Sequence, residues 1–174
     1  MIELERTFLA KAVPAGIEKY KSKEIVDVYI PASHPHPTLR IRKEGDKFFL
    51  TKKQPVAGDA SEQKEQTVEL SREEFETLSS VPGKVVQKIR FYYPFEGRTA
   101  EIDVFQGQLR GLVLVDFEFS TPEDKAAFTR PDFCLADVTQ EEFIAGGKLC
   151  GKCYKDIESQ LQWFGYTKLE VCGK

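Results

Sequence analysis

Several residue types are scarce in this sequence of 174 residues, and each scarcity excludes a class of protein. Four cysteines are too few for a secreted scaffold held by disulfides, so reduced thiols are expected. No apolar run approaches the ~18 residues of a membrane-spanning helix. Residues 1–6 alternate charged and apolar side chains, so we expect no secretory leader. A net charge of −3 argues against a nucleic-acid backbone as the main partner.

The length and composition indicate a soluble protein with one domain over residues 1–174. With no leader and no membrane span expected, the predicted location is the cytoplasm. The sequence has no internal repeat and no segment typical of a linker between domains.

Alternation of polar and apolar residues is the dominant pattern, and it predicts strands. Turn residues separate two pairs of runs, at residues 44–46 and 96–98, as hairpin loops would. The predicted strands are residues 2–8, 24–30, 39–43, 48–53, 65–70, 85–93, 99–105 and 112–119. Eight strands at this spacing favour an antiparallel barrel or a strongly curved sheet.

Helices are fewer and begin at clear capping signals. Residues 71–74 form a capping box, and residues 121–124 place a cap before a proline. Residues 139–142 open a short turn, and residues 154–164 carry one apolar face of a C-terminal helix. Residues 55–63 are interpreted as a loop and as the one candidate for a mobile lid.

The polar faces of the strands are unusual because they are charged and mostly carry one sign per strand. Where a set has two members they lie two or four residues apart, so they project from the same side of their strand. The sets are Glu3 and Glu5; Arg40 and Arg42; Lys53; Glu65 and Glu69; Lys88 and Arg90; Glu101 and Asp103; Asp116 and Glu118.

Two structures fit this pattern. In the first, an open sheet packs its apolar side on helices and leaves the charges in solvent. In the second, the sheet closes and the charges line its bore. The sorting by sign, and the use of Arg, Asp and Glu, favour the closed form, since these residues bind phosphate and hard metal ions. Buried charges need partners, so such a bore would hold ion pairs, water and a polyanion with divalent cations.

Residues 3–9 (ELERTFL) resemble the amino-terminal ExExK signature of the CYTH superfamily, the triphosphate tunnel metalloenzymes. Six further segments resemble the later motifs of this family, and the resemblance extends from residue 2 to about residue 165. In chain order they are the RxR strand (39–43), the TxK strand (50–53), the central acidic strand (65–69), the KxR strand (88–90) and two late acidic strands (101–105 and 116–119).

The resemblance implies an α+β fold, mainly antiparallel β: an eight-stranded closed tunnel barrel with helices packed outside. It also implies a small-molecule triphosphate as substrate, Mg²⁺ or Mn²⁺ as cofactor, and metal-assisted attack of water on the terminal phosphorus. No nucleic-acid or membrane partner is expected, and the chain would be a monomer or a homodimer.

The same resemblance implies roles for individual residues. Glu3, Glu5, Asp116 and Glu118 would bind metal, whereas Glu65, Glu69, Glu101 and Asp103 would either complete the metal shells or tether basic residues. The phosphate-binding and catalytic set would be Arg40, Arg42, Lys53, Lys88 and Arg90, with Glu3 and Glu5 as the catalytic carboxylates.

The predicted function is triphosphate hydrolysis, with inorganic triphosphate as first choice and nucleoside or thiamine triphosphate next. The signature lysine of the family is replaced by Thr7, and Lys11 faces the same way only if the strand continues. Two alternatives remain open: a class IV adenylyl cyclase, and a non-catalytic sensor of polyphosphate or a nucleotide.

Three other motifs have simpler interpretations. Residues 146–153 resemble a P-loop but place Cys153 where Mg²⁺ needs Ser or Thr, so a glycine-rich hinge with Lys152 pointing into the tunnel as a substrate ligand is favoured. Cys150 and Cys153, with Cys134 and Cys172, have spacing too irregular to favour zinc. The two histidines, at 34 and 36, lie among prolines, where no metal role is expected.

Overall fold

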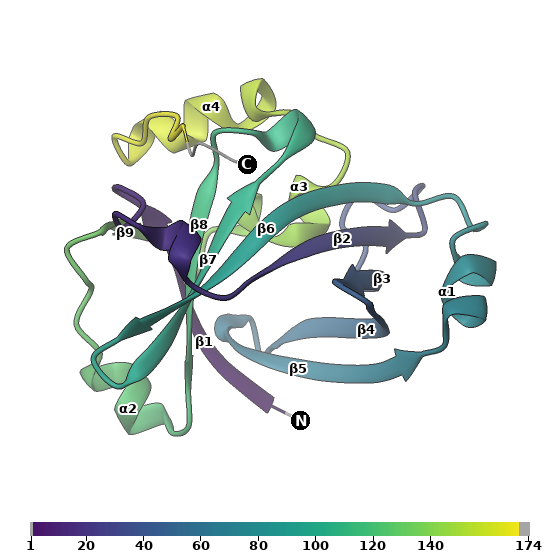
Figure 1. Ribbon diagram of the computed structural model, residues 1–174, viewed down its shortest axis with the longest axis horizontal. Coiled ribbons are helices and arrows are strands. Elements are labelled where there is room, and N and C mark those ends of the chain that lie inside the picture. Colours follow the sequence, from purple (N-terminus) through teal and green to yellow (C-terminus); the bar gives the residue numbers. More distant parts are fainter. Residues whose placement is uncertain (1, 171–174) are drawn as a thin grey trace.

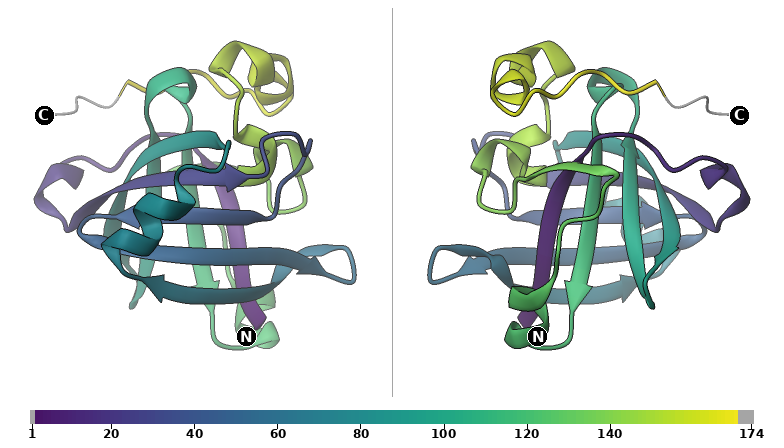
Figure 2. Two further views of the ribbon diagram at one scale, coloured as in Figure 1. Left: turned by 90° about the vertical axis from the view of Figure 1, so that its right-hand side faces the viewer. Right: turned by 90° about the vertical axis from the view of Figure 1, so that its left-hand side faces the viewer.

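The computed structural model describes residues 2–170, and its eight predicted strands close into one antiparallel barrel (Figure 1). Strand neighbours run in the order β5-β4-β3-β2-β6-β7-β8-β1, and β5 also pairs with β1, which closes the ring. The strands are β1 (Ile2–Ala10), β2 (Ser22–Ile30), β3 (Leu39–Glu44), β4 (Lys47–Val56), β5 (Asp59–Leu70), β6 (Lys84–Phe95), β7 (Arg98–Phe105) and β8 (Val113–Phe119). In Figure 2, β4 and β5 run crosswise to β1 and β8, and β5 meets the N-terminal part of β1.

A ninth strand, β9 (Cys134–Asp137), was not predicted. It pairs with the C-terminal part of β1, where Phe8 lies opposite Asp137, whereas β5 pairs with the N-terminal part, where Glu3 lies opposite Gln63. One edge of β1 is therefore shared between two strands. Four residues are too few for alternation to reveal a strand.

The prediction of a loop over residues 55–63 is wrong. β4 continues to Val56 and β5 begins at Asp59, so that only Ala57 and Gly58 form the turn. Both turn residues have positive φ (48° and 84°), as in the two-residue turns whose twist matches that of paired strands. This segment, the candidate for a mobile lid, is a long hairpin of paired strands and not a loop.

The helices lie outside the ring of strands (Figure 1). They are α1 (Arg72–Leu78), α2 (Pro122–Ala127), α3 (Gly146–Leu149) and α4 (Tyr154–Trp163), with single 3-10 turns at Ile17–Lys19, Gly107–Leu109 and Glu142–Ile144. The three helix starts at residues 71, 121 and 154 were predicted from the sequence. Within residues 2–170, no helix is long and apolar enough to cross a membrane.

The segments α3 and α4 lie over one end of the barrel (Figure 2), and an apolar layer of side chains fills the bore beneath them. The inward-facing strand residues at this end are aliphatic or aromatic, and they pack on the C-terminal helices. This layer contains Leu9, Tyr29, Val86, Phe105 and Leu114 from the strands, and Ile144, Leu149, Ile157 and Leu161 from the C-terminal segment. The charged part of the bore therefore ends against a hydrophobic wall.

A second apolar cluster covers the outer face of the barrel. Phe8, Ile102 and Phe117 are fully buried there against residues that follow α2, such as Phe128. Because side chains alternate along a strand, these apolar residues face outward and their charged neighbours face inward. The closed barrel, rather than the open solvated sheet, is thus the observed arrangement.

Candidate functional site

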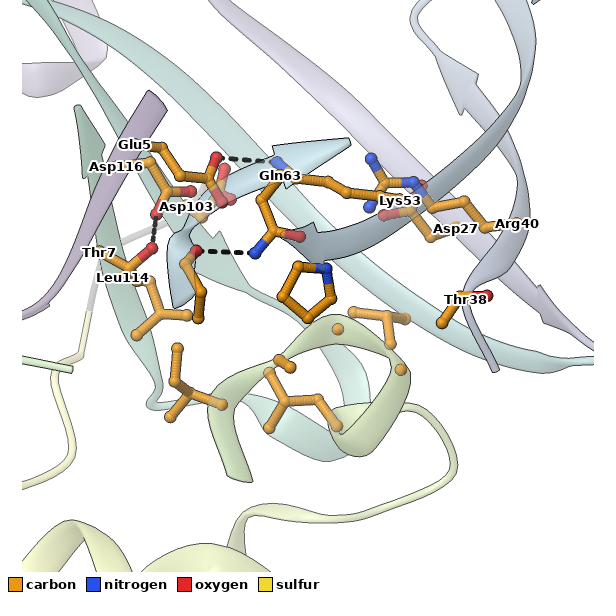
Figure 3. Close-up of a pocket in the computed structure, with 18 of the residues that line it drawn as sticks. Glu5, Thr7, Asp27, Thr38, Arg40, Lys53, Gln63, Asp103, Leu114 and Asp116 are labelled. Carbon is orange, nitrogen blue, oxygen red and sulfur yellow. Dashed lines mark hydrogen bonds and ion pairs between the residues drawn. The ribbon is translucent and has the colours of Figure 1, made fainter. Parts of the chain in front are cut away.

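A cavity of about 740 Å³ occupies the bore (Figure 3). Its acidic side chains outnumber its basic ones, so divalent cations bound together with a polyanion would offset the excess negative charge. The basic side chains are Arg40, Arg42, Lys53, Lys88 and Arg90; the acidic ones are Glu3, Glu5, Asp27, Glu65, Glu101, Asp103, Asp116, Glu118, Glu141 and Glu142.

The basic pair on β3 is organised by Asp27 of β2, which is 2% exposed. Arg42 donates from Nε to Oδ1 of Asp27 at 2.7 Å and from Nη2 to Oδ2 at 2.9 Å, and Nε of Arg40 lies 3.8 Å from Oδ1. Burial opposes ionisation of Asp27, but the two guanidinium groups outweigh burial and hold its pKa well below the usual range. Asp27 was missed in the sequence, although it has inward parity within a predicted strand.

Arg40 is less completely paired than Arg42. Its Nη1 donates to the hydroxyl of Tyr29 at 3.2 Å, but its buried Nε has no hydrogen-bond partner in residues 2–170. A buried donor without a partner is unfavourable, so Arg40 is prepared to bind an anion.

The basic pair on β6 is held in a similar way by Asp103 of β7, which is 1% exposed. Arg90 donates to Asp103 from Nε at 2.6 Å and from Nη2 at 2.7 Å, and the ammonium of Lys88 pairs with the same carboxylate. Burial opposes ionisation of Asp103 too, yet Arg90 and Lys88 keep its pKa below the usual range. Arg90 also pairs with Glu101.

Three predicted metal ligands gather around one lysine instead. Nζ of Lys53 lies 2.8 Å from Glu5, 3.1 Å from Glu3 and 3.9 Å from Glu65. Burial raises the pKa of the Glu3 carboxyl. The inward carboxylates of β1, β7 and β8 form an acidic wall of the cavity, and Lys53 neutralises part of it.

The remaining carboxylates face one another across neighbouring strands. Glu5 of β1 is directly opposite Glu118 of β8, and Asp116 is directly opposite Glu101 of β7. Like charges at such positions destabilise a sheet. Burial, together with nearby carboxylates, raises the pKa of Glu101 to about 7 and that of Asp116 to about 6. Thr7, in the position of the signature lysine, donates from Oγ1 to Asp116 at 2.7 Å.

This acidic wall has the chemistry of a hard-cation site, because carboxylate oxygens are the ligands of Mg²⁺ and Mn²⁺. Within residues 2–170, however, no three Asp, Glu, His or Cys side chains are already gathered as a ligand set. The ion pairs account for this, since Glu5 is held by Lys53 and Glu101 by Arg90.

The structure places three residues differently from the sequence-based expectation. Glu69 has inward parity, but it lies near the exposed end of β5, outside the cavity, 3.6 Å from Lys47. Lys152 was expected to point into the tunnel; it follows α3 and does not line the cavity, which Gly146 and Gly147 line instead. Lys11 lies beyond the end of β1 and is exposed.

The cysteines and histidines were also singled out in the sequence. Cys134 and Cys150 are buried free thiols and Cys153 is a half-buried one, whereas Cys172 lies outside the described residues. His36 lines the cavity, and its Nδ1 is 3.4 Å from Glu142.

Comparisons with known proteins agree with this geometry. Residues 1–109 match the family model described as the CYTH domain. The chain is 31% identical over 144 residues to an inorganic triphosphatase of Nitrosomonas europaea, covering 82% of this chain and 92% of that protein. It is 31% identical over 123 residues to an inorganic triphosphatase of Acetivibrio thermocellus, covering 70% and 76% of the two chains.

Solved structures show the same fold. A crystal structure of an inorganic triphosphatase superposes with a TM-score of 0.62 at 27% identity, covering 85% of this chain and 93% of the other. A protein from Pyrococcus horikoshii gives a TM-score of 0.51 at 19% identity, covering 95% and 91%. The second likeness bears on the fold alone.

Proposed function

This chain belongs to the CYTH domain family, and from that premise we propose that it is a metal-dependent hydrolase of inorganic triphosphate. The observation that carries the proposal is the arrangement of charge in the cavity, where basic side chains of β3, β4 and β6 face the carboxylates of β1, β7 and β8. A linear polyanion bound by divalent cations matches both walls at once.

The basic wall would bind the phosphate chain. Arg40 has a buried donor without a hydrogen-bond partner in residues 2–170, and Arg42, Lys88 and Arg90 are already oriented by aspartates. Guanidinium groups match phosphate oxygens in two-point hydrogen bonds, and they stabilise the charge that spreads over a transferring phosphoryl group.

The acidic wall would hold the metal, with Glu5, Asp116 and Glu118 as the first ligands and Glu3 and Glu101 beside them. A divalent ion bound there supplies a polarised phosphoryl oxygen and a more acidic water. The family is in general metal-dependent, and the raised pKa values of Glu101 and Asp116 indicate excess negative charge that a cation would neutralise.

The apolar end of the bore favours inorganic triphosphate over a nucleotide. The side chains of Val86, Phe105, Leu114 and Leu149, which close the cavity at this end, carry no polar group that could bind the edge of a base. A phosphate chain with two bare ends needs no such group. The relatives named inorganic triphosphatase support the same choice.

The test is to incubate the protein separately with triphosphate, thiamine triphosphate and ATP in the presence of Mg²⁺ or Mn²⁺. We expect orthophosphate and pyrophosphate from triphosphate, at a kcat/KM at least tenfold above that for ATP. Cyclic AMP from ATP would support a cyclase, and tight binding of triphosphate without turnover would support a sensor; either result contradicts the proposal.

A further inference from the structure

Two of the acidic residues in the cavity differ from the rest in how they are used. Asp27 and Asp103 are only 2% and 1% exposed, and each lies on a strand next to a strand that carries two basic residues. Asp27 of β2 faces Arg40 and Arg42 of β3, and Asp103 of β7 faces Lys88 and Arg90 of β6.

Both oxygens of each aspartate are bound. Oδ1 and Oδ2 of Asp27 accept from Arg42 at 2.7 and 2.9 Å, and those of Asp103 accept from Arg90 at 2.6 and 2.7 Å. A two-point contact of this kind fixes the plane of a guanidinium as well as its position. Each aspartate also lies near a second cation, Arg40 in one case and Lys88 in the other.

The carboxylates of β8 are not used in this way. Oδ1 of Asp116 accepts from the hydroxyl of Thr7 at 2.7 Å and Oδ2 accepts from Nη2 of Arg90 at 3.4 Å, whereas Glu118 makes no hydrogen bond or ion pair within residues 2–170. The oxygens of Glu118 are therefore available to a cation. Asp116 makes a single long contact with a guanidinium, where Asp27 and Asp103 each make a short two-point contact.

We propose that Asp27 and Asp103 are positioning residues that hold the basic pairs of β3 and β6 facing the phosphate chain, and that neither binds metal. This proposal rests on the proposed function, since it takes the phosphate chain as the ligand. Long basic side chains lose conformational freedom when they bind an anion, and side chains that are ordered beforehand lose less.

The first experiment separates position from charge. Arg42→Lys keeps the positive charge but loses the two-point contact with Asp27, and Asp27→Glu keeps the negative charge while moving the carboxylate. Affinity for triphosphate is measured by calorimetry in EDTA, where no turnover occurs. We expect both variants to bind at least fivefold more weakly in EDTA and, in separate turnover assays with Mg²⁺, to show a raised KM. Wild-type affinity in Arg42→Lys would overturn the proposal.

The second experiment asks which aspartates bind metal, by titrating each protein with Mn²⁺ without triphosphate. Asp103→Asn should remain within about threefold of the wild-type affinity, and its matched control Asp116→Asn should be at least tenfold weaker. Equal losses in the two variants would contradict the assignment of Asp103.

A third measurement needs no ligand and therefore stays informative if triphosphate does not bind. In ¹⁵N spectra of the wild type, the Nε–H signal of Arg42 should be resolved and protected from exchange with water, and in Asp27→Asn it should be lost. If Asp27→Asn fails to fold, Arg42→Lys and Asp27→Glu still decide the question. A protected Arg42 signal in folded Asp27→Asn would overturn the positioning role.

Discussion

Thr7 donates a hydrogen bond from its hydroxyl to Oδ1 of Asp116 over 2.7 Å, at the centre of the acidic wall. The backbone N–H of Thr7 in turn donates to Oγ1 of Thr139 at 3.1 Å, at the start of the segment that leads to α3. A neutral side chain therefore occupies the position at which the family signature has a lysine. As a result, residue 7 places no positive charge beside Asp116 that would compete with a metal ion for its carboxylate.

Replacing Thr7 tests this relationship. Thr7→Lys would place an ammonium beside Asp116, and at an effective dielectric constant of about 20 such a pair interacts by several kcal/mol. We expect Mn²⁺ affinity to fall about tenfold, equivalent to ~1.4 kcal/mol, while triphosphate binding in EDTA becomes tighter. Calorimetry measures both.

The matched control is Thr7→Val, which removes the hydroxyl at nearly constant volume and adds no charge. Its Mn²⁺ affinity should change less than that of Thr7→Lys. If the lysine variant binds Mn²⁺ as well as the wild type does, Asp116 is not a metal ligand.

Arg40 should contribute more to substrate affinity than its fellow cations, because its buried Nε has no hydrogen-bond partner in residues 2–170. A hydrogen bond to a charged group contributes about 1.5–3 kcal/mol, so Arg40→Gln should raise KM for triphosphate at least tenfold. Lys152→Gln serves as the control, because Lys152 lies outside the cavity, and its KM should stay within twofold of the wild type. Equal effects of the two changes would show that the cavity is not the binding site.

Metal affinity should depend on pH in a defined window. The pKa of Glu101 is raised to about 7 and that of Asp116 to about 6, so both carry a larger fraction of protons below neutrality than an ordinary carboxyl does. A metal must displace those protons. We expect Mn²⁺ affinity to rise from pH 5.5 to 7.5 and then level off. Calorimetry in two buffers should detect proton release at pH 6.5 but not at pH 8.5.

The raised pKa values of Glu101 and Asp116 also predict how the stability of the metal-free protein depends on pH. Both carboxyls ionise less readily in the folded state than in the unfolded chain, so folding favours the protonated forms. The stability that these groups contribute is present at low pH and is lost as the pH rises through the raised folded values. Between pH 5 and 8, the free energy of unfolding should therefore fall without metal and recover with saturating Mn²⁺. A metal-free protein whose stability rises steadily over this range would contradict both shifts.

The glycines of α3 should be sensitive to the smallest substitution. A Cβ on Gly147 would lie 2.3 Å from the carbonyl oxygen of Pro37, and one on Gly146 would lie 1.9 Å from the hydroxyl of Tyr29. Overpacking of this kind destabilises by about 1–3 kcal/mol. Gly147→Ala should lower Tm by several degrees in a thermal melt, and an unchanged Tm would show that α3 does not pack against the barrel as described.

The parts of this molecule that the sequence predicts are those that repeat with a short period. Polar and apolar residues alternate along all eight barrel strands, and inward charge could therefore be assigned for residues as far apart as Glu5 and Glu118. Helix starts were equally readable, because Ser71 and Thr121 accept the backbone hydrogen bonds that caps require.

The parts that were missed depend on contacts distant in sequence. Asp27 stands alone between Val26 and Val28, and only the pairing of β2 with β3 reveals it as the partner of Arg42. Glu69 has the parity of Glu65, but parity does not show where along the barrel axis the cavity ends. The hairpin turn requires a positive φ at Ala57, and an alanine in the sequence gives no reason to expect one.

Diffraction from crystals grown with Mn²⁺ and triphosphate tests the account most directly, with data collected at a wavelength where manganese scatters anomalously. We predict an anomalous peak among Glu5, Asp116 and Glu118, with triphosphate or its pyrophosphate and orthophosphate products along Arg40, Arg42 and Arg90. A manganese peak on Asp27 or Asp103, or triphosphate bound outside the barrel, would contradict it.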